Sequence, residues 1–310
     1  MSDHLMKNVL LVGTGNMAIE YAKVLDALQI SYDVIGRSEE RTENFKKVTE
    51  HFAYAGGLEH FLSNHPQVYD AAIVAVQDYL ECECTELLIQ YGIKKILAEK
   101  PLGLDIESLE NVKAVADKNN AEVYVAYNRR FYASTLAAEK MIEEDGGVSS
   151  FHFEFTELHC ESVERAENWL ISNSGHVIDL AFFLGGKPIE MSSYADRVMD
   201  DRERIAFVGC DRSESRALFS YCANYRAPGR WGVEIMTPQR RLIFKPMEKL
   251  QIQHLGKFVM EEYPIDNKLD LLYKPGLYKQ TEAFLSGKIQ RLKTIEEQIE
   301  STKLNYKILC

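Results

Sequence analysis

Residues 9–18, Val-Leu-Leu-Val-Gly-Thr-Gly-Asn-Met-Ala, join an apolar strand-like run to a Gly13-x-Gly15-x-x-Ala18 motif that opens an amphipathic helical pattern. Gly13 permits a tight turn, Gly15 lets the backbone approach a phosphate with no Cβ in the way, and small Ala18 lets the helix pack closely on the strand. The N–H groups and positive dipole end at the start of such a helix attract an anion. The motif therefore predicts a pyrophosphate site of a dinucleotide, with an ordinary glycine turn as the alternative.

Strand and helix patterns alternate over the first 126 residues. Strand-like runs are expected at 8–12, 32–36, 70–76, 94–98 and 122–126, and helical patterns at 16–28, 38–50, 80–91 and 106–118. This alternation is typical of an α/β fold with a doubly wound parallel sheet, whose ligand binds at the carboxyl ends of the strands. We therefore expect a Rossmann domain over residues 1–126.

The remaining residues, 127–310, show a different pattern. A helical stretch at 133–144 is followed by alternating runs at 151–155 and 217–221, with a helix at about 167–184 between them and helical patterns again from Gly276 onward. Alternation of apolar and polar residues indicates strands with one buried face. The expectation is a C-terminal α+β domain whose largely antiparallel sheet is open on one face.

Composition limits the classes of partner. The 310 residues carry a formal net charge of -11, which disfavours binding to nucleic acid or to an anionic membrane. The sequence lacks a long apolar run and its start lacks the apolar core of a secretory signal, so a cytoplasmic location is expected. The six cysteines have no paired spacing typical of a metal site, and Cys82 and Cys84 fall in a helical stretch, so no metal is expected.

The residues after the second strand-like run bear on the choice of cofactor. An NAD site places an acidic residue there to hold the ribose 2′-hydroxyl, whereas an arginine accommodates the 2′-phosphate of NADP. This chain has Arg37 and Ser38 at that position and Arg41 one helical turn further on. The pattern predicts that NADP(H) is preferred over NAD(H); the alternative is that Glu39 or Glu40 makes the ribose contact.

Two further motifs add a resemblance to a known family. The fourth expected strand ends in Ala98-Glu99-Lys100-Pro101-Leu102-Gly103, and the fifth is followed by Tyr127-Asn128-Arg129-Arg130-Phe131. Together with Gly13-Thr14-Gly15-Asn16-Met17-Ala18, these segments resemble the glucose-fructose oxidoreductase, inositol dehydrogenase and MocA family (Gfo/Idh/MocA). The resemblance implies a Rossmann domain followed by an α/β domain whose open sheet often forms subunit contacts. It also implies pyridine-nucleotide redox chemistry on the CH–OH group of sugars, cyclitols or nucleotide-sugar-like compounds.

Two residues are expected to carry the chemistry. The Lys100 ammonium, at the carboxyl end of a strand, can hydrogen-bond the reacting oxygen and stabilise developing alkoxide charge. His176 matches the histidine of the family's Asp-x-x-x-His motif, in which the histidine is the acid/base. Ser172 stands where the family has aspartate, and it cannot supply the charge that stabilises an imidazolium. Asp179 could take that place or have a structural role.

The remaining expectations concern binding. The residues expected to bind the cofactor are Gly13, Thr14, Gly15, Asn16, Met17, Arg37, Ser38, Arg41, Ala75, Val76, Glu99 and Lys100. The residues expected at the substrate are Lys100, Tyr127, Asn128, Arg129, Trp169, Ser172 and His176, while Arg130 and Phe131 are expected to be structural. The alternative for Trp169 and His176 is packing in the core, and the alternative for Lys100 is a surface charge paired with Glu99. Contacts of the segment 77–81 are not assigned, because Gln77 and Glu81 replace the family's proline and histidine there.

The sequence thus predicts an NAD(P)-dependent oxidoreductase of carbinols or ketones. The alternative from another class is a catalytically silent dinucleotide-binding sensor of the same fold, because a fold can persist after an activity is lost. A sheet with only one covered face leaves apolar surface exposed, and such a surface favours contact with another subunit. A homodimer or homotetramer is therefore expected.

Overall fold

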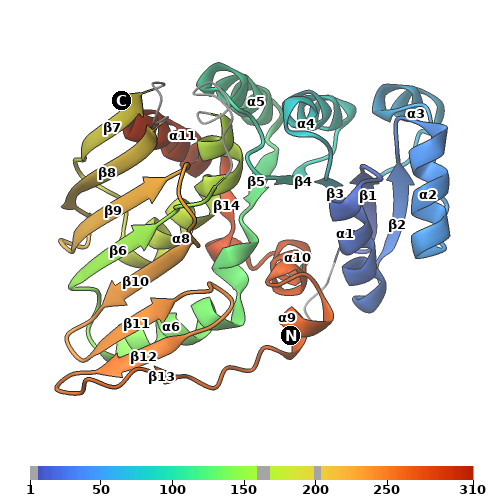
Figure 1. Cartoon of the computed structure of the whole chain (residues 1–310). Helices are drawn as coiled ribbons and strands as arrows, with labels where there is room; N and C mark the ends of the chain where they lie inside the picture. The colour runs from blue at the N-terminus through green and yellow to red at the C-terminus, as the bar shows by residue number, and fades with distance from the viewer. Residues whose placement is uncertain (1–5, 159–167, 199–203, 310) are drawn as a thin grey trace. The chain divides into compact units, whose positions relative to one another are not determined.

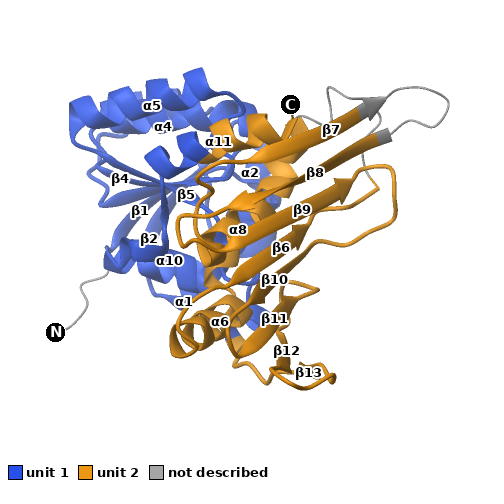
Figure 2. Cartoon of the chain, turned by 90° about the vertical axis from the view of Figure 1, so that its left-hand side faces the viewer, with its two compact units in different colours: residues 1–128, 269–300 blue, residues 129–268, 301–310 orange. Residues whose placement is uncertain are grey.

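The computed structural model describes residues 6–158, 168–198 and 204–309, and it divides into two compact units. Unit 1 comprises residues 1–128 and 269–300, and unit 2 comprises residues 129–268 and 301–310 (Figure 2). The chain therefore leaves unit 1 near the expected boundary at 126/127 but returns to it at residue 269, so 127–310 is not one uninterrupted unit. None of the described helices combines the length and apolar character required to cross a membrane.

Unit 1 contains a six-stranded sheet in the order β14-β5-β4-β3-β1-β2 (Figure 1). The strands are β1 (Asn8–Val12), β2 (Ser31–Ile35), β3 (Ala71–Val74), β4 (Lys95–Glu99), β5 (Glu122–Ala126) and β14 (Lys293–Thr294). The first five are parallel, and β14 pairs antiparallel with β5. The chain reverses its direction of travel across the sheet between β1 and β3, which is the point where such sheets bind ligands.

Helices cover both faces of this sheet. They are α1 (Asn16–Ala27), α2 (Glu39–Thr49), α3 (Leu58–Asn64), α4 (Glu81–Tyr91), α5 (Ile106–Asn119) and α10 (Leu277–Ser286), with short helices η1 (Asp78–Leu80), η4 (Ile289–Arg291) and α9 (Lys268–Leu272). Figure 1 shows α4 and α5 on one face and α1 and α10 on the other. Burial on both faces explains why β3, Ala-Ala-Ile-Val, is apolar throughout instead of alternating.

Unit 2 is built on an eight-stranded sheet in the order β13-β12-β11-β10-β6-β9-β8-β7. Its strands are β6 (Ser150–Glu154), β7 (Ser192–Val198), β8 (Arg204–Arg212), β9 (Leu218–Asn224), β10 (Gly232–Met236), β11 (Arg240–Phe244), β12 (Gln251–His254) and β13 (Glu261–Glu262). All neighbours are antiparallel except β6 and β9. The expected open, largely antiparallel sheet is confirmed.

One face of this sheet is packed and the other is open. Helices α6 (Ala133–Glu144) and α8 (Gly175–Gly185) lie on the packed face, over the inward rings of Phe151 and Phe153 (Figures 1 and 2). The C-terminal part of α11 (Ile295–Leu309) adds Ile308 and Leu309 to the same core. The alternate positions of β7, β8 and β9 place Tyr194, Val208 and Leu218 on the open face, where they are exposed.

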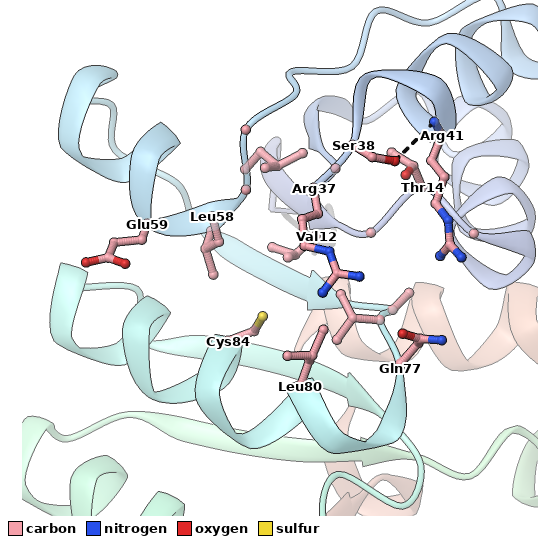
Figure 3. A pocket seen from close by; sticks show the side chains of 18 of the residues that line it. Val12, Thr14, Arg37, Ser38, Arg41, Leu58, Glu59, Gln77, Leu80 and Cys84 are labelled. Atoms are coloured by element: carbon pink, nitrogen blue, oxygen red, sulfur yellow. Dashed lines mark hydrogen bonds between the residues drawn. The ribbon is translucent and has the colours of Figure 1, made fainter.

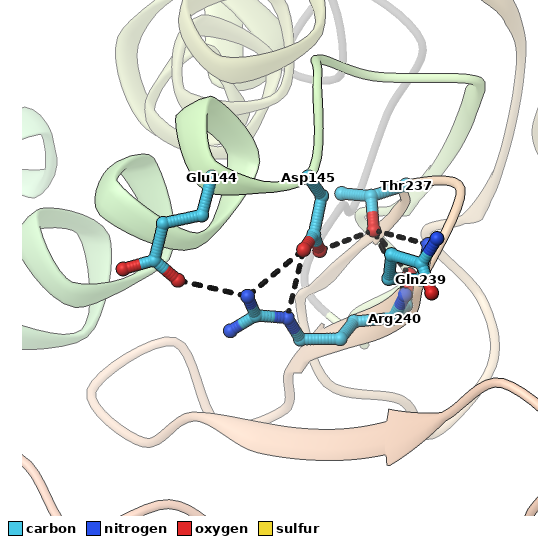
Figure 4. A network of polar contacts seen from close by, with 5 residues as sticks. All are labelled: Glu144, Asp145, Thr237, Gln239 and Arg240. Atoms are coloured by element: carbon cyan, nitrogen blue, oxygen red, sulfur yellow. Dashed lines mark hydrogen bonds and ion pairs between the residues drawn. The ribbon is translucent and has the colours of Figure 1, made fainter.

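A polar network fixes the end of α6 to the turn between β10 and β11 (Figure 4). The Asp145 carboxylate accepts from Thr237 Oγ1 at 2.7 Å and from Arg240 Nε and Nη2 at 3.2 and 2.8 Å. Arg240 Nη2 also donates to Glu144 at 2.8 Å. Because Asp145 is buried and Arg240 is mostly so, this network holds the helix end in one position.

Candidate active site

A cavity of about 860 Å³ lies in unit 1 at the carboxyl ends of β1 and β3 (Figure 3). Ten of the twelve residues expected at the cofactor line it: Gly13, Thr14, Gly15, Asn16, Met17, Arg37, Ser38, Arg41, Ala75 and Val76. Glu99 and Lys100 are not among its lining residues. The cavity is large enough to hold a substantial part of a dinucleotide.

The glycine motif has the geometry of a phosphate cradle. Gly13 has φ of +124°, and a Cβ there would lie 2.1 Å from the Ala75 carbonyl oxygen, so only glycine fits between β1 and β3. A Cβ on Gly15, the N-cap of α1, would meet nothing within 4 Å. Because glycine has no Cβ, the backbone at Gly15 is accessible to an incoming group, as a pyrophosphate at a helix N-terminus requires. The residues present therefore fit a dinucleotide.

The end of β2 presents basic and hydroxyl groups to the cavity. Figure 3 shows the Arg37 guanidinium pointing toward Gln77 and Leu80. Ser38 caps α2 by accepting from the Arg41 backbone N–H at 3.4 Å, and its own O–H remains able to donate. Glu39 and Glu40, the alternative ribose contacts, do not line the cavity.

The opposite wall of the cavity carries an apolar patch among its polar residues, and the sequence patterns did not predict it. Leu58 from α3 faces Leu80 and Cys84 from η1 and α4 (Figure 3). Burial raises the pKa of the Cys84 thiol to about 12, so it stays protonated. This wall suits the flat ring of a nucleobase. The signal in the sequence is the pair Gly56-Gly57, whose positive φ values of 102° and 86° turn the chain into α3.

Lys100 lies at the end of β4, in a turn held by buried groups. Leu102, with φ of +67°, donates its N–H to Glu81 Oε2 at 2.9 Å, and Gln298 Nε2 donates to the Pro101 carbonyl at 3.0 Å. Beside it, Glu99 accepts from the Tyr21 hydroxyl at 2.8 Å. Burial raises the pKa of both Glu81 and Glu99. These contacts fix the turn that carries Lys100. The Glu99 side chain is bound by Tyr21 and does not line the cofactor cavity.

In unit 2, His176 occupies the second position of α8 and is 9% exposed. The preceding residues Leu170–Ser174 form a π-helical turn, η3, which contains Ser172. The helix expected over 167–184 is thus not uniform: its start at 167 lies outside the described residues, residues 168–169 are α-helical, and the π turn follows before α8 begins. An inserted π turn changes the register between Ser172 and His176, and such turns are frequent at functional sites.

Asp179 has a structural partner. Its two carboxylate oxygens accept from Arg130 Nε and Nη2 at 2.8 and 2.7 Å, and both side chains are buried. The pair agrees with the structural role predicted for Arg130, and it engages the Asp179 carboxylate on Arg130. Glu157 lies beside η3, where it accepts from Trp169 Nε1 at 2.8 Å and from Asn173 Nδ2 at 3.2 Å.

A second cavity, of about 300 Å³, lies within unit 2 and includes Arg129 in its lining. Trp169 does not line it; the chain's other tryptophan, Trp231, does.

Two residues expected at the substrate lie in unit 1, and their side chains contact other residues of that unit. The Tyr127 ring is buried with the Lys293 ammonium 4.1 Å from its centroid, and Asn128 Nδ2 donates to the Pro275 carbonyl at 2.9 Å.

Comparison with known proteins finds a family match in the first part of the chain. Residues 7–127 match the family model GFO_IDH_MocA, described as an oxidoreductase family with an NAD-binding Rossmann fold. The Rossmann part of the chain thus matches the Gfo/Idh/MocA family. Over 194 residues, the chain is 28% identical to the scyllo-inositol 2-dehydrogenase (NADP+) IolW of Bacillus subtilis. The aligned region covers 60% of this chain and 51% of that protein. The matched region thus spans about half the length of this relative.

Solved structures share the fold of nearly the whole chain. A dehydrogenase from Chromobacterium violaceum superposes with a TM-score of 0.81 at 16% identity, covering 98% of this chain and 95% of the other. Levoglucosan dehydrogenase in complex with NADH and levoglucosan gives a TM-score of 0.76 at 17% identity, covering 97% and 96%. At these identities the likeness concerns the fold.

Glu81 departs from the Gfo/Idh/MocA motif, and the structure shows a consequence of this departure. The glutamate replaces the histidine of the usual motif, is 1% exposed and accepts from the Leu102 N–H. It therefore supports the Lys100 turn from inside the fold. Gln77, which replaces the usual proline, lines the nucleotide cavity.

Proposed function

We propose that this protein is an NADP(H)-preferring oxidoreductase that acts on the CH–OH or ketone group of a sugar, cyclitol or nucleotide-sugar-like substrate. The observation that carries the proposal is the unit 1 cavity, which combines the Gly13–Met17 cradle with Arg37, Ser38 and Arg41. The carboxylates that line this cavity, Glu59 and Glu83, belong to α3 and α4. Neither stands at the end of β2, where an NAD site has its acidic residue. The NADP+ named for the relative IolW supports this preference, whereas the NADH in levoglucosan dehydrogenase supports NAD(H) as the alternative.

The roles follow from the chemistry of each side chain. A bound nicotinamide supplies hydride chemistry at its C4 atom. During oxidation of a carbinol, His176 accepts the hydroxyl proton as the carbon loses hydride and the carbonyl forms; during reduction His176 returns the proton. Lys100 donates a hydrogen bond to the same oxygen and stabilises its negative charge. Arg129, Ser172 and Trp169 are proposed to orient the substrate, with Tyr127 and Asn128 acting through the backbone they fix.

Turnover separates this function from the silent sensor. The sensor is favoured by one observation: Ser172 replaces the acidic partner of His176, and the nearby Asp179 is paired with Arg130. A panel of cyclitols, sugars and nucleotide sugars is tested with NADP+ and NAD+, following nicotinamide absorbance. Reduction of NADP+ by one class of substrate supports the oxidoreductase. NADPH binding without turnover on any member supports the sensor.

We further propose a cytoplasmic homodimer or homotetramer assembled through the open face of the unit 2 sheet. The exposed apolar side chains Tyr194, Val208 and Leu218 on this face support the proposal. Light scattering at micromolar concentration is expected to give twice or four times the monomer mass. Val208→Glu and Leu218→Glu are expected to lower that mass, because charge is placed on the contact face. A monomer in the wild-type protein contradicts the assembly.

A further inference from the structure

Two consecutive arginines of unit 2 differ in their partners. Arg130 is paired with both oxygens of Asp179. The adjacent Arg129 lines the 300 Å³ cavity, and its buried Nε has no hydrogen-bond partner among the residues that the structure describes. A buried guanidinium is stable only when its charge and its N–H donors are satisfied, so the unpaired arginine requires an explanation.

The position of Arg129 is well defined. Its guanidinium carbon lies 5.1 Å from the centroid of the Trp231 ring and 5.9 Å from that of Tyr132. Its carbonyl oxygen accepts from Thr135 Oγ1 at 2.8 Å, which fixes the backbone. The two rings lie beside the guanidinium and offer it no hydrogen-bond acceptor in their planes, so its N–H groups are the atoms that can bind a ligand.

The neighbouring carboxylates do not neutralise it. Glu157 accepts from Trp169, Asn173 and Ser174, at 2.8, 3.2 and 3.5 Å. Burial lowers the pKa of Arg129, and the opposing attraction of Glu248 and Glu157 is weaker than this effect. Over the described ranges 6–158, 168–198 and 204–309, no carboxylate forms an ion pair with Arg129.

The buried polar atoms of the cavity lining that lack a partner within the described part of the chain are both donors: Arg129 Nε and the indole Nε1 of Trp231. Glu157 and Glu248 also line the cavity, but Glu157 already accepts from Trp169 and Asn173, and Glu248 is exposed. The hydroxyl groups of a neutral polyol bring donors that the two buried N–H groups cannot accept. A ligand group that only accepts, a carboxylate or a phosphate, matches two unsatisfied N–H groups better.

We infer that the unit 2 cavity is a subsite for an oxyanion of the substrate, which Arg129 binds through its in-plane N–H groups and Trp231 through its indole N–H. The inference rests on the proposed function in that the ligand is taken to be the substrate, and it narrows the substrate class to acidic or phosphorylated sugars and polyols. At about 300 Å³ the cavity holds one small group of this kind rather than a long chain.

Calorimetric titration of the full chain tests the inference with three matched probes. D-glucuronate carries a carboxylate, D-glucose 6-phosphate carries a phosphate, and D-glucose carries neither. At least one anionic probe is expected to bind about tenfold or more tightly than glucose, and the stronger of the two identifies the oxyanion. Equal affinity for all three probes, or no saturable binding of either anion, overturns the inference.

Variants assign the effect to the two donors. Arg129→Met is expected to reduce the anion's affinity to that of glucose, and Trp231→Phe, which keeps a ring and removes the N–H, to weaken it several-fold. Arg212→Met, at an exposed position of β8 outside the cavity, is the control and should bind as the wild type does. Circular dichroism checks that each variant folds. If Arg129→Met is unfolded, Trp231→Phe decides, and unchanged affinity there overturns the inference.

This test separates the subsite from the redox function. Binding is measured without nicotinamide, and turnover is measured independently. Anion binding that depends on Arg129, without turnover of any substrate, leaves the subsite standing and contradicts the oxidoreductase. Turnover of neutral substrates that Arg129→Met does not affect supports the oxidoreductase and overturns the subsite.

Discussion

The guanidinium of Arg130 donates two hydrogen bonds to the carboxylate of Asp179, at 2.8 and 2.7 Å, in the interior of unit 2. This pair joins the segment after β5 to α8, three residues beyond His176. Arg130 binds Asp179, and this bond holds the helix that also carries His176. The pair is a structural element next to the proposed acid/base and does not replace the aspartate that the family has at position 172.

Asp179→Asn is expected to destabilise the protein by about 3–5 kcal/mol, because it leaves the buried charge of Arg130 uncompensated. Urea denaturation measures the change in the free energy of unfolding. The exposed helical pair Lys113–Asp117 provides a control, and Asp117→Asn should cost less than about 1 kcal/mol. Equal effects of the two substitutions would show that the buried pair contributes little.

Glu81→Gln is expected to change how stability depends on pH. The pKa of Glu81 is raised well above its ordinary value of 4.5, chiefly by burial, so its contribution to stability is present at low pH and is lost as pH rises through its folded-state pKa. Glutamine keeps the shape and an oxygen acceptor for the Leu102 N–H, but it does not ionise. The difference between the Tm of the variant and the Tm of the wild type should therefore become more positive from pH 5 to pH 8.

The control for this experiment is Glu83→Gln, an exposed position two residues further along α4. Its Tm difference from wild type should stay constant over the same range. A Glu81→Gln difference that is independent of pH would show that Glu81 ionises in the folded protein as it does in the unfolded chain.

Arg37→Asp is expected to reverse the cofactor preference. In the wild type, a charge-assisted contact of Arg37 with a 2′-phosphate should favour NADPH over NADH by about 1.5–3 kcal/mol, and an aspartate at this position repels the phosphate. Fluorescence titration with each nucleotide gives the two dissociation constants. Glu39→Gln, next to the cavity but not in its lining, should leave both unchanged. Equal constants for the two nucleotides in the wild type refute the preference.

The local patterns of unit 1 were readable from the sequence because each has a local cause. The strand-glycine-helix motif at 9–18 forms β1, the turn and the start of α1, and the structure brings ten of the expected cofactor residues to one cavity. Strand β14 could not be anticipated, because two residues, Lys293 and Thr294, carry no periodicity and pair with β5 only through tertiary contacts.

The substrate side of the site was harder to predict. Trp169 and Trp231 both suit a sugar face by composition, and only the fold places Trp231 in the cavity and the Trp169 N–H on Glu157. In the same way, Arg129 and Arg130 are adjacent in sequence, and their different partners follow from the turn that points them to different surroundings. Side-chain partners across a fold are tertiary facts that a linear pattern does not contain.

His176 is the proposed proton carrier. His176→Asn removes the proton acceptor while keeping a similar shape, so kcat on a carbinol substrate should fall by about 10²- to 10⁴-fold with little change in NADPH affinity. Nucleotide affinity provides the internal control, since the residues of the unit 1 cavity do not include His176. A near-normal kcat with an unaltered pH profile would eliminate His176 as the proton carrier.

Ser172→Asp tests whether the missing carboxylate limits this protein. A carboxylate within reach of the His176 ring raises the pKa of the imidazole and favours the imidazolium that forms as the carbinol is oxidised. We expect higher turnover and a shift of the kcat profile to higher pH in this variant, whereas Ser172→Ala, which adds no carboxylate, should leave the pH profile unshifted. If Ser172→Asp lowers turnover with the profile unshifted, the π-helical register of η3 directs position 172 away from His176, and the serine serves the substrate instead.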